Sequence, residues 1–219
     1  MRIILTGATG MVGQGVLREC LLDAGVTEIL SIARSPLHRQ DPKLRELVLP
    51  DIGNLSGNEP QLAGYDACFF CAGISSAGMS EEKYTHLTYD ITLSFARTLA
   101  PLNPQMTFIY VSGAGTDSTE KGRSMWARVK GRTENALLRL PFKAAYMFRP
   151  GFIQPLHGIR SKTRLYQFFY DLTAPLKPLL KGRFPKYLTT TEQIGRAMLA
   201  VARKGYPKTI LDPIDINQL

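Results

Sequence analysis

The sequence predicts an α/β fold in which helices cover both faces of one parallel, doubly wound sheet. Apolar runs of strand length alternate with segments of helical periodicity along most of the chain. A glycine-rich turn follows the first apolar run and leads directly into a helical pattern. The length of 219 residues suits a single domain, 1–219, and the 44% hydrophobic and 21% charged content is typical of globular proteins.

The glycine turn spans residues 6–13, between a short buried strand at 2–5 and a helix with an apolar stripe. Gly7 lets the backbone leave the strand sharply, Gly10 removes a side chain where a phosphate would lie, and Gly13 allows close helix-to-strand contact. The helix N-terminus offers free N–H groups and a positive dipole end to an anion. The spacing is G-x-x-G-x-x-G rather than G-x-G-x-x-G, but its place between strand and helix predicts dinucleotide binding.

The second strand, 28–33, ends at Arg34, and Arg39 lies close behind it. In a dinucleotide fold this strand end faces the adenosine ribose, where an acidic residue favours a free 2′-hydroxyl and an arginine favours a 2′-phosphate. The sequence therefore predicts NADP(H) as the cofactor rather than NAD(H). The alternative is that Arg34 is an ordinary surface arginine in a loop.

The later elements continue the alternation. Strands are predicted at 46–49, around Cys68, at 106–111, at 144–148 and at 206–211. A polar connection covers 54–64, and helices are predicted from Ser80, as N-cap, to a stop at Pro101, at 124–140, and at 192–202 with Thr191 as N-cap.

The three cysteines are too few for a disulfide framework in a chain of this size. Cys68 and Cys71 form a C-x-x-C, but residues three apart on a strand point to opposite faces. Their Cα atoms would lie about 10 Å apart, beyond the roughly 7 Å limit for a disulfide. We therefore expect core packing. The three histidines show no ligand spacing, so no metal site is predicted.

The net charge of +9 favours anionic partners, and a phosphorylated cofactor is one of them. Nucleic acid is not expected, because the sequence has no zinc spacing, helix-turn-helix signature or aromatic-basic RNA motif. No apolar run reaches the roughly 20 residues of a membrane helix, and no charged-then-apolar leader precedes the first strand. We therefore expect a cytoplasmic protein.

Motifs along nearly the whole chain resemble the short-chain dehydrogenases/reductases, and in particular the small atypical members of the Tat-interacting protein/oxidoreductase group. These motifs are the glycine turn, Cys71-Ala72-Gly73, Ser112, Val129-Lys130-Gly131-x-x-Glu134 and Arg149-Pro150-Gly151. The resemblance implies a Rossmann fold with bound NADP(H). The cofactor residues that it implies are Gly7, Thr9, Gly10, Met11, Val12, Gly13, Arg34, Asp51, Ile52, Cys71, Ala72, Gly73, Lys130, Pro150, Gly151 and Ile153.

The resemblance also implies an active site, with one departure. The family uses a serine to orient the carbonyl, a tyrosine to move the proton, and a lysine four residues later that lowers the tyrosine pKa and holds the nicotinamide ribose. Ser112 and Lys130 match, but Trp126 stands at the tyrosine position, and an indole N–H is no acid near neutral pH. Because Trp126 shares a helix face with Lys130, we expect it to pack over the nicotinamide pocket.

Another group would have to supply the proton, and the candidates are Tyr84, Tyr89, Tyr110, Asp117 and a bound water. Two functions stay open. The first is an NADP(H)-dependent oxidoreductase, or an epimerase-like variant, acting on a small carbonyl or alcohol substrate. The second is a catalytically silent NADP(H)-binding regulatory or interaction protein. The retention of a serine and a lysine favours the first, although either could be a structural residue, and the tryptophan favours the second.

After Gly151 the alternation stops, and the family resemblance makes 151–190 a lid or substrate-side wall. Basic residues surround a short amphipathic helix there, and such a helix can also lie on an anionic membrane surface, so peripheral membrane contact through 160–186 stays open. The apolar positions of that helix are Leu165, Phe168, Phe169 and Leu172.

Overall fold

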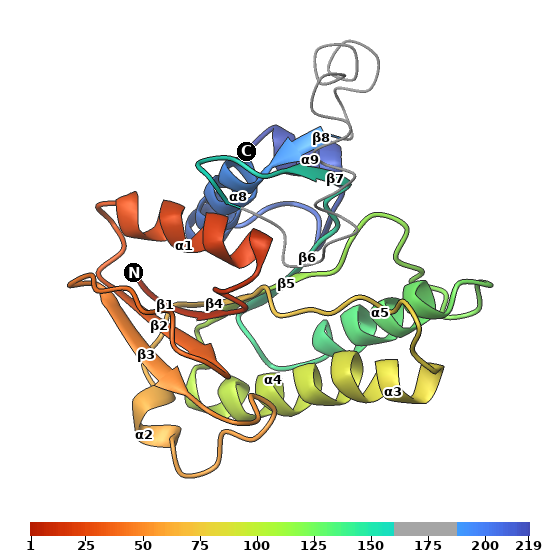
Figure 1. Ribbon diagram of the computed structural model, residues 1–219, viewed down its shortest axis with the longest axis horizontal. Helices are drawn as coiled ribbons and strands as arrows, with labels where there is room; N and C mark the ends of the chain where they lie inside the picture. Colours follow the sequence, from red (N-terminus) through yellow and green to blue (C-terminus); the bar gives the residue numbers. More distant parts are fainter. Residues whose placement is uncertain (160–187) are drawn as a thin grey trace.

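The computed structural model describes residues 1–159 and 188–219 (Figure 1). Its main sheet contains β1 (Arg2–Thr6), β2 (Glu28–Ala33), β3 (Leu44–Val48), β4 (Ala67–Phe70), β5 (Thr107–Val111), β6 (Ala144–Phe148) and β9 (Ile210–Leu211). The strand order is β3-β2-β1-β4-β5-β6-β9, and all neighbouring strands are parallel. From β1, the chain first adds β2 and β3 on one side and then β4, β5 and β6 on the other. The switch point of this doubly wound sheet therefore lies between β1 and β4. The predicted fold class is confirmed.

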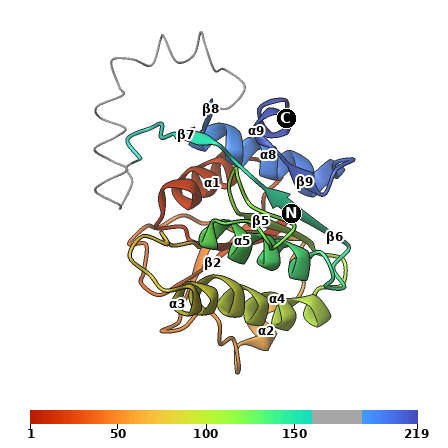
Figure 2. The ribbon, with the colours of Figure 1, turned by 90° about the vertical axis from the view of Figure 1, so that its right-hand side faces the viewer.

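Helices cover both faces of the sheet (Figures 1 and 2). One face carries α1 (Met11–Leu22) and α8 (Thr191–Lys204). The other carries a continuous run of α3 (Glu81–Thr85), the π-helix η1 (His86–Asp90) and α4 (Ile91–Leu102), together with α5 (Met125–Leu137). Two short helices, α2 (Glu59–Leu62) and α9 (Pro213–Asn217), complete the described part.

Alternating strand residues fill two separate cores. Ile3 and Leu5 of β1 pack toward α1 and α8, whereas Ile4 between them packs toward α4. Cys68 likewise lies in the α4-side core, while Cys71 packs against the α1-side core, and both thiols are free. The prediction that these two cysteines pack on opposite faces without a disulfide is confirmed.

Several predicted element boundaries were wrong. Pro101 does not stop its helix, since α4 continues to Leu102. The proline is tolerated there because its missing N–H costs only one backbone hydrogen bond, in the last turn. The N-cap of α8 is Thr190, whose hydroxyl accepts the Gln193 N–H at 2.9 Å, so the cap lies one residue earlier than predicted. The last strand is only β9, α2 lies within the predicted connection, and α9 follows the last predicted strand, where no element was predicted.

A small parallel sheet pairs β7 (Phe152–Gln154) with β8 (Leu188–Thr190), and it was not predicted. It brings together the two ends of the chain segment that the sequence assigns to a lid. The predicted amphipathic helix and the basic residues of 160–186 lie outside the described residues. In 1–159 and 188–219, no helix combines the length and the apolar character needed to cross a membrane.

The first and last long helices are in direct backbone contact. A Cβ added to Gly15 of α1 would lie 2.6 Å from the carbonyl oxygen of Thr191, and one added to Gly195 of α8 would lie 2.7 Å from Cγ of Glu19. Such distances are too short for a methyl group, so glycine is required on both helices. This contact attaches the C-terminal helix to the helix that follows the glycine turn.

We expect Gly15→Ala to lower the free energy of unfolding by about 1–3 kcal/mol, because the added methyl forces α1 and α8 apart. Urea denaturation measures the change. Gly73→Ala is the matched control, since a Cβ there meets no heavy atom within 4 Å, and it should change stability by no more than about 0.5 kcal/mol. Equal stability of the two variants would contradict the tight packing of the helices.

Candidate functional site

The glycine turn brings three backbone segments into contact. Gly7 has a φ of +71°, and a Cβ there would lie 2.5 Å from the carbonyl carbon of Cys71, just past the end of β4. A Cβ on Gly13 would lie only 2.1 Å from the carbonyl oxygen of Gly7. The N–H of Gly10 donates to that same oxygen at 2.8 Å. The turn therefore tolerates only glycine at positions 7 and 13.

The N-terminus of α1 is open. Its N-cap is Gly10, which has no side chain to cap the first turn, and that turn contains no acidic residue. The first N–H groups of an α-helix have no partner within the helix, and together with the dipole they favour an anion. The start of α1 is thus available to a negatively charged group.

A cleft of about 360 Å³ opens beside this helix end, at the carboxyl edge of β1, β2 and β4. Arg34 is exposed at its rim and makes no ion pair with any residue that the structure describes. The predicted cofactor residues that line the cleft are Gly7, Thr9, Gly10, Met11, Arg34, Ile52, Cys71, Ala72 and Gly73.

The other predicted cofactor residues do not line this cleft. Val12 and Gly13 lie in the first turn of α1, and the exposed carboxylate of Asp51 accepts the Gly53 N–H at 2.8 Å. The remaining ones are found on α5 or follow β6, on the far side of the switch point: Lys130, Pro150, Gly151 and Ile153.

Seven further residues line the cleft that were not predicted as cofactor residues: Ile32, Ala33, Phe70, Ile74, Leu87, Ile91 and Thr92. Leu87 and Ile91 belong to an apolar repeat of four residues in the helix predicted from Ser80 to Pro101, and such a repeat by itself indicates only a core-facing stripe. They reach the cleft because this helix starts near the carboxyl edge of β4 and contains the π-helix turn η1. The available signal was the position of these residues soon after the predicted ligand-binding strand end.

Ser112 belongs to a buried polar cluster. Its hydroxyl donates to the carboxylate of Glu134, which is fully buried on α5, and lies 3.2 Å from the Phe148 carbonyl oxygen. Arg149 forms an ion pair with the same carboxylate, with Nε 3.0 Å from Oε1. The cluster therefore ties the ends of β5 and β6 to α5, and the Ser112 hydrogen is already donated within the protein.

Lys130 lies next to this cluster on α5. Its ammonium group donates to the backbone oxygen of Ser112. Burial lowers the pKa of Lys130 to about 8, although the nearby Glu134 carboxylate acts in the opposite direction. The structure thus brings Ser112 and Lys130 together, as predicted, through the serine backbone rather than its hydroxyl.

Trp126 lies one turn before Lys130 and is partly buried. A Cβ on Gly115 would lie 3.4 Å from its ring atom Cη2, so the indole packs on the loop that follows β5. The same loop is held close to α5 at Gly131, where a Cβ would lie 1.8 Å from the Asp117 carbonyl oxygen. Trp126 is therefore a packing residue of the β5–α5 connection.

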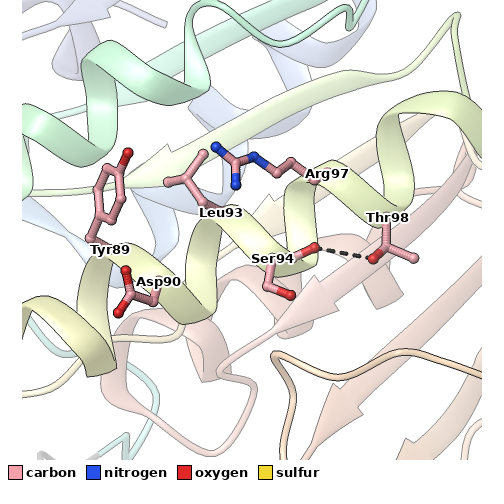
Figure 3. Close-up of a pocket in the computed structure, with 6 residues that line it drawn as sticks. All are labelled: Tyr89, Asp90, Leu93, Ser94, Arg97 and Thr98. Carbon is pink, nitrogen blue, oxygen red and sulfur yellow. Dashed lines mark hydrogen bonds between the residues drawn. The ribbon is translucent and has the colours of Figure 1, made fainter.

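The protein candidates for the proton donor lie away from the cleft. Tyr84 and Tyr110 are buried, and burial raises the pKa of Tyr110. Hydrogen bonds from Thr119 and from the Gly122 N–H lower the pKa of the Asp117 carboxyl, which favours its ionised form. Tyr89 lies on η1 and lines an outer groove together with residues of α4 (Figure 3). The Arg132 guanidinium lies 4.3 Å over its ring.

The Lys130 pKa predicts a pH dependence of stability. Below pH 8 this lysine is charged in both states, and its desolvation costs stability in the folded state. Between about 8 and the ordinary value of 10.5, the folded protein has released the proton that the unfolded chain still holds. The unfolding free energy of the native protein should therefore rise with pH in this window relative to Lys130→Met.

Urea denaturation at several pH values between 7 and 10 measures this difference. Lys121→Met, at an exposed lysine on the preceding loop, is the control and should follow the native curve. Parallel curves for the native protein and Lys130→Met would show that burial does not lower the pKa of Lys130.

No protein-family model matches the chain. Leucinostatins biosynthesis cluster protein T of Purpureocillium lilacinum is 30% identical over 64% of the chain, which spans only 52% of that protein. Protein fmp52, mitochondrial, of Emericella nidulans is 27% identical, with 93% of the chain and 88% of the relative covered. Protein HTATIP2 of Rattus norvegicus is 24% identical, with 68% and 61% covered.

Solved structures share the fold at low identity. A short chain dehydrogenases/reductase from Saccharomyces cerevisiae, YIR035C, matches with a TM-score of 0.68 and 15% identity, covering 97% of this chain and 95% of that one. The UDP-glucuronic acid 4-epimerase from Bacillus cereus, solved in complex with NAD, matches with a TM-score of 0.70 and 14% identity, covering 97% and 78%.

The expected cytoplasmic location is wrong on this comparison. Fmp52 relatives that match over most of the chain are named as mitochondrial proteins, not cytoplasmic ones. The expectation depended on the absence of a leader pattern, and the residues that determine the fold do not encode the compartment. The predicted resemblance is confirmed: the chain is similar to HTATIP2 and to the Fmp52 proteins, and it has the Rossmann fold of the solved short-chain dehydrogenase/reductase and epimerase structures.

Proposed function

We propose that the protein is an NADP(H)-binding oxidoreductase, or an epimerase-like variant, that acts on a small carbonyl or alcohol substrate. The observation that carries this proposal is the combination, in one cleft, of an uncapped helix N-terminus and an exposed arginine that forms no ion pair within 1–159 and 188–219. The first suits a pyrophosphate and the second suits a ribose 2′-phosphate.

The cleft fits such a cofactor. A side chain at Gly10 would project from the helix N-cap toward the phosphate position, so the glycine leaves that position clear. The turn would hold the pyrophosphate by its N–H groups, Arg34 would pair with the 2′-phosphate, and Ile52 and Leu87 would supply apolar walls. Bound NADP(H) supplies or accepts a hydride. The chain's own residues must then position the substrate and supply the proton.

Lys130 is the group that we propose for proton transfer in place of the family's tyrosine. Its pKa of about 8 is close to neutral pH, where a general acid or base is most effective. It lies one helical turn from the residue that replaces the tyrosine. Ser112 would contribute by fixing the lysine through its carbonyl oxygen, because its hydroxyl is engaged by Glu134.

A catalytically silent NADP(H)-binding regulator is the second candidate. Two observations favour it, namely the packing of Trp126 on Gly115 and the donation of the Ser112 hydroxyl to a buried carboxylate. In that case the cofactor would change a surface that binds another protein, and no hydride would be transferred.

Cofactor binding can be followed directly because Trp126 is the only tryptophan of the chain. NADPH should quench its fluorescence, and Arg34→Ala should weaken NADPH binding about 10-fold, since one charge-assisted contact is lost. Binding of NADH should change little. Arg97→Ala, at an exposed arginine on α4, removes the same charge elsewhere and should bind NADPH normally. An unaltered NADPH affinity in Arg34→Ala would refute the 2′-phosphate assignment.

Turnover separates the two functions. NADPH oxidation over a panel of small aldehydes and ketones should be measurable in the native protein and should fall about 100-fold or more in Lys130→Ala. Trp126→Tyr restores the family's tyrosine and should raise the rate. Activity that appears only in Trp126→Tyr would support the silent regulator, whereas native activity unaffected by Lys130→Ala would remove the lysine from the mechanism.

A further inference from the structure

A second cleft, of about 520 Å³, lies against the other side of the glycine turn. Its most buried lining residues are Ala8 and Leu17, which are 1% and 4% exposed. Pro36 and Leu37 of the β2–β3 connection and Ile159 after β7 add further apolar surface. Three segments distant in the sequence thus form a pocket with apolar surface and a volume suited to a small organic molecule.

The polar lining of this second cleft is basic. It contains Arg18, Arg39 and His157, and no carboxylate from the described ranges lines it. The His157 ring nitrogen Nε2 is already paired with Glu192 at 2.7 Å, so the two arginines carry the charge of the cleft. Arg39 is exposed and forms no ion pair within those ranges, and Arg18 uses one guanidinium nitrogen to pair with Glu19. Two guanidinium groups beside an apolar surface suit a molecule with an anionic head and an apolar body.

The second cleft is physically connected to the cofactor cleft. Thr9 lines both. Gln14 lines the second cleft, and its Nε2 donates to the Thr9 carbonyl oxygen at 3.1 Å. This hydrogen bond stabilises the glycine turn from the side of the second cleft. A ligand in the second cleft therefore lies against the same turn that would hold the pyrophosphate.

We propose that the second cleft binds a carboxylate carried on an apolar chain, and that its occupancy weakens dinucleotide binding in the neighbouring cleft. Two anions on either side of Thr9 would share the positive end of α1 and repel each other. Because coupling between two sites is reciprocal, the dinucleotide would weaken carboxylate binding by the same factor. The carboxylate site stands on the second cleft alone, whereas the coupling rests on the proposed function.

Calorimetric titration of the full chain with octanoate tests the site. Octanol carries a comparable tail without the charge, and inorganic phosphate carries charge without a tail. Octanoate should bind more tightly than either, because the cleft offers both apolar surface and guanidinium groups. Equal binding of octanol would overturn the role of the arginines, and equal binding of inorganic phosphate would overturn the role of the apolar surface.

Variants locate the bound carboxylate. Arg18→Gln should weaken octanoate binding about 10-fold, and Arg39→Gln gives a second, independent variant should the first lose stability. Arg97→Gln, in the outer groove of Figure 3, removes the same charge from α4 and should bind octanoate like the native protein. Equal octanoate affinity in all three variants would overturn the site.

The coupling is measured as the NADPH dissociation constant at increasing octanoate. It should rise about 5-fold and then reach a plateau, and Arg18→Gln should remove the rise at the same octanoate concentrations. A rise without a plateau would mean competition in the cofactor cleft and would overturn the proposal, as would an unchanged constant at saturating octanoate. If NADPH does not bind at all, the proposed function fails, and octanoate titration alone then decides the second cleft.

Discussion

The contact between Gly13 and the carbonyl oxygen of Gly7 sets the geometry on which the rest of the structure depends. It places the first turn of α1 directly on the backbone that leaves β1, and the opposite side of that turn contacts the end of β4. The helix axis and the switch point of the sheet are thereby fixed relative to each other. Both clefts lie against this turn, one on each side.

The buried Glu134 carboxylate gives a second constraint, and it changes the role that can be inferred for Ser112 and Lys130. A buried charge is costly unless it is paired and hydrogen-bonded. Here Arg149 pairs with it, Ser112 donates to it, and Lys130 holds the adjacent backbone oxygen. These residues therefore have a structural role that does not depend on turnover. Their presence in the sequence is weaker support for catalysis than the resemblance alone suggests.

The sequence was sufficient for features governed by local rules. The periodicity of the strands, the opposite faces of Cys68 and Cys71, and the glycine turn all follow from spacing that neighbouring residues impose. The predicted residues of the glycine turn and of the strand ends do line one cleft, because parallel strands bring their carboxyl ends to one edge.

The features that were missed depend on contacts between distant residues. The Ser112 cluster joins residues from β5, α5 and β6, and the second cleft joins α1 to the segments around Pro36 and His157. A one-residue shift of a cap, as at Thr190, depends on which hydroxyl reaches an N–H in three dimensions. Pattern and propensity carry no information on these distances.

The pairing of β7 with β8 has a consequence for how related proteins can diverge. The chain between them leaves and re-enters the structure through two strands held by their own parallel pairing, outside the main sheet. Within the described residues, the seven strands of the main sheet pair only with one another, so their order does not depend on the residues between β7 and β8. The strand order that positions the glycine turn can therefore stay the same in relatives whose sequences differ between β7 and β8.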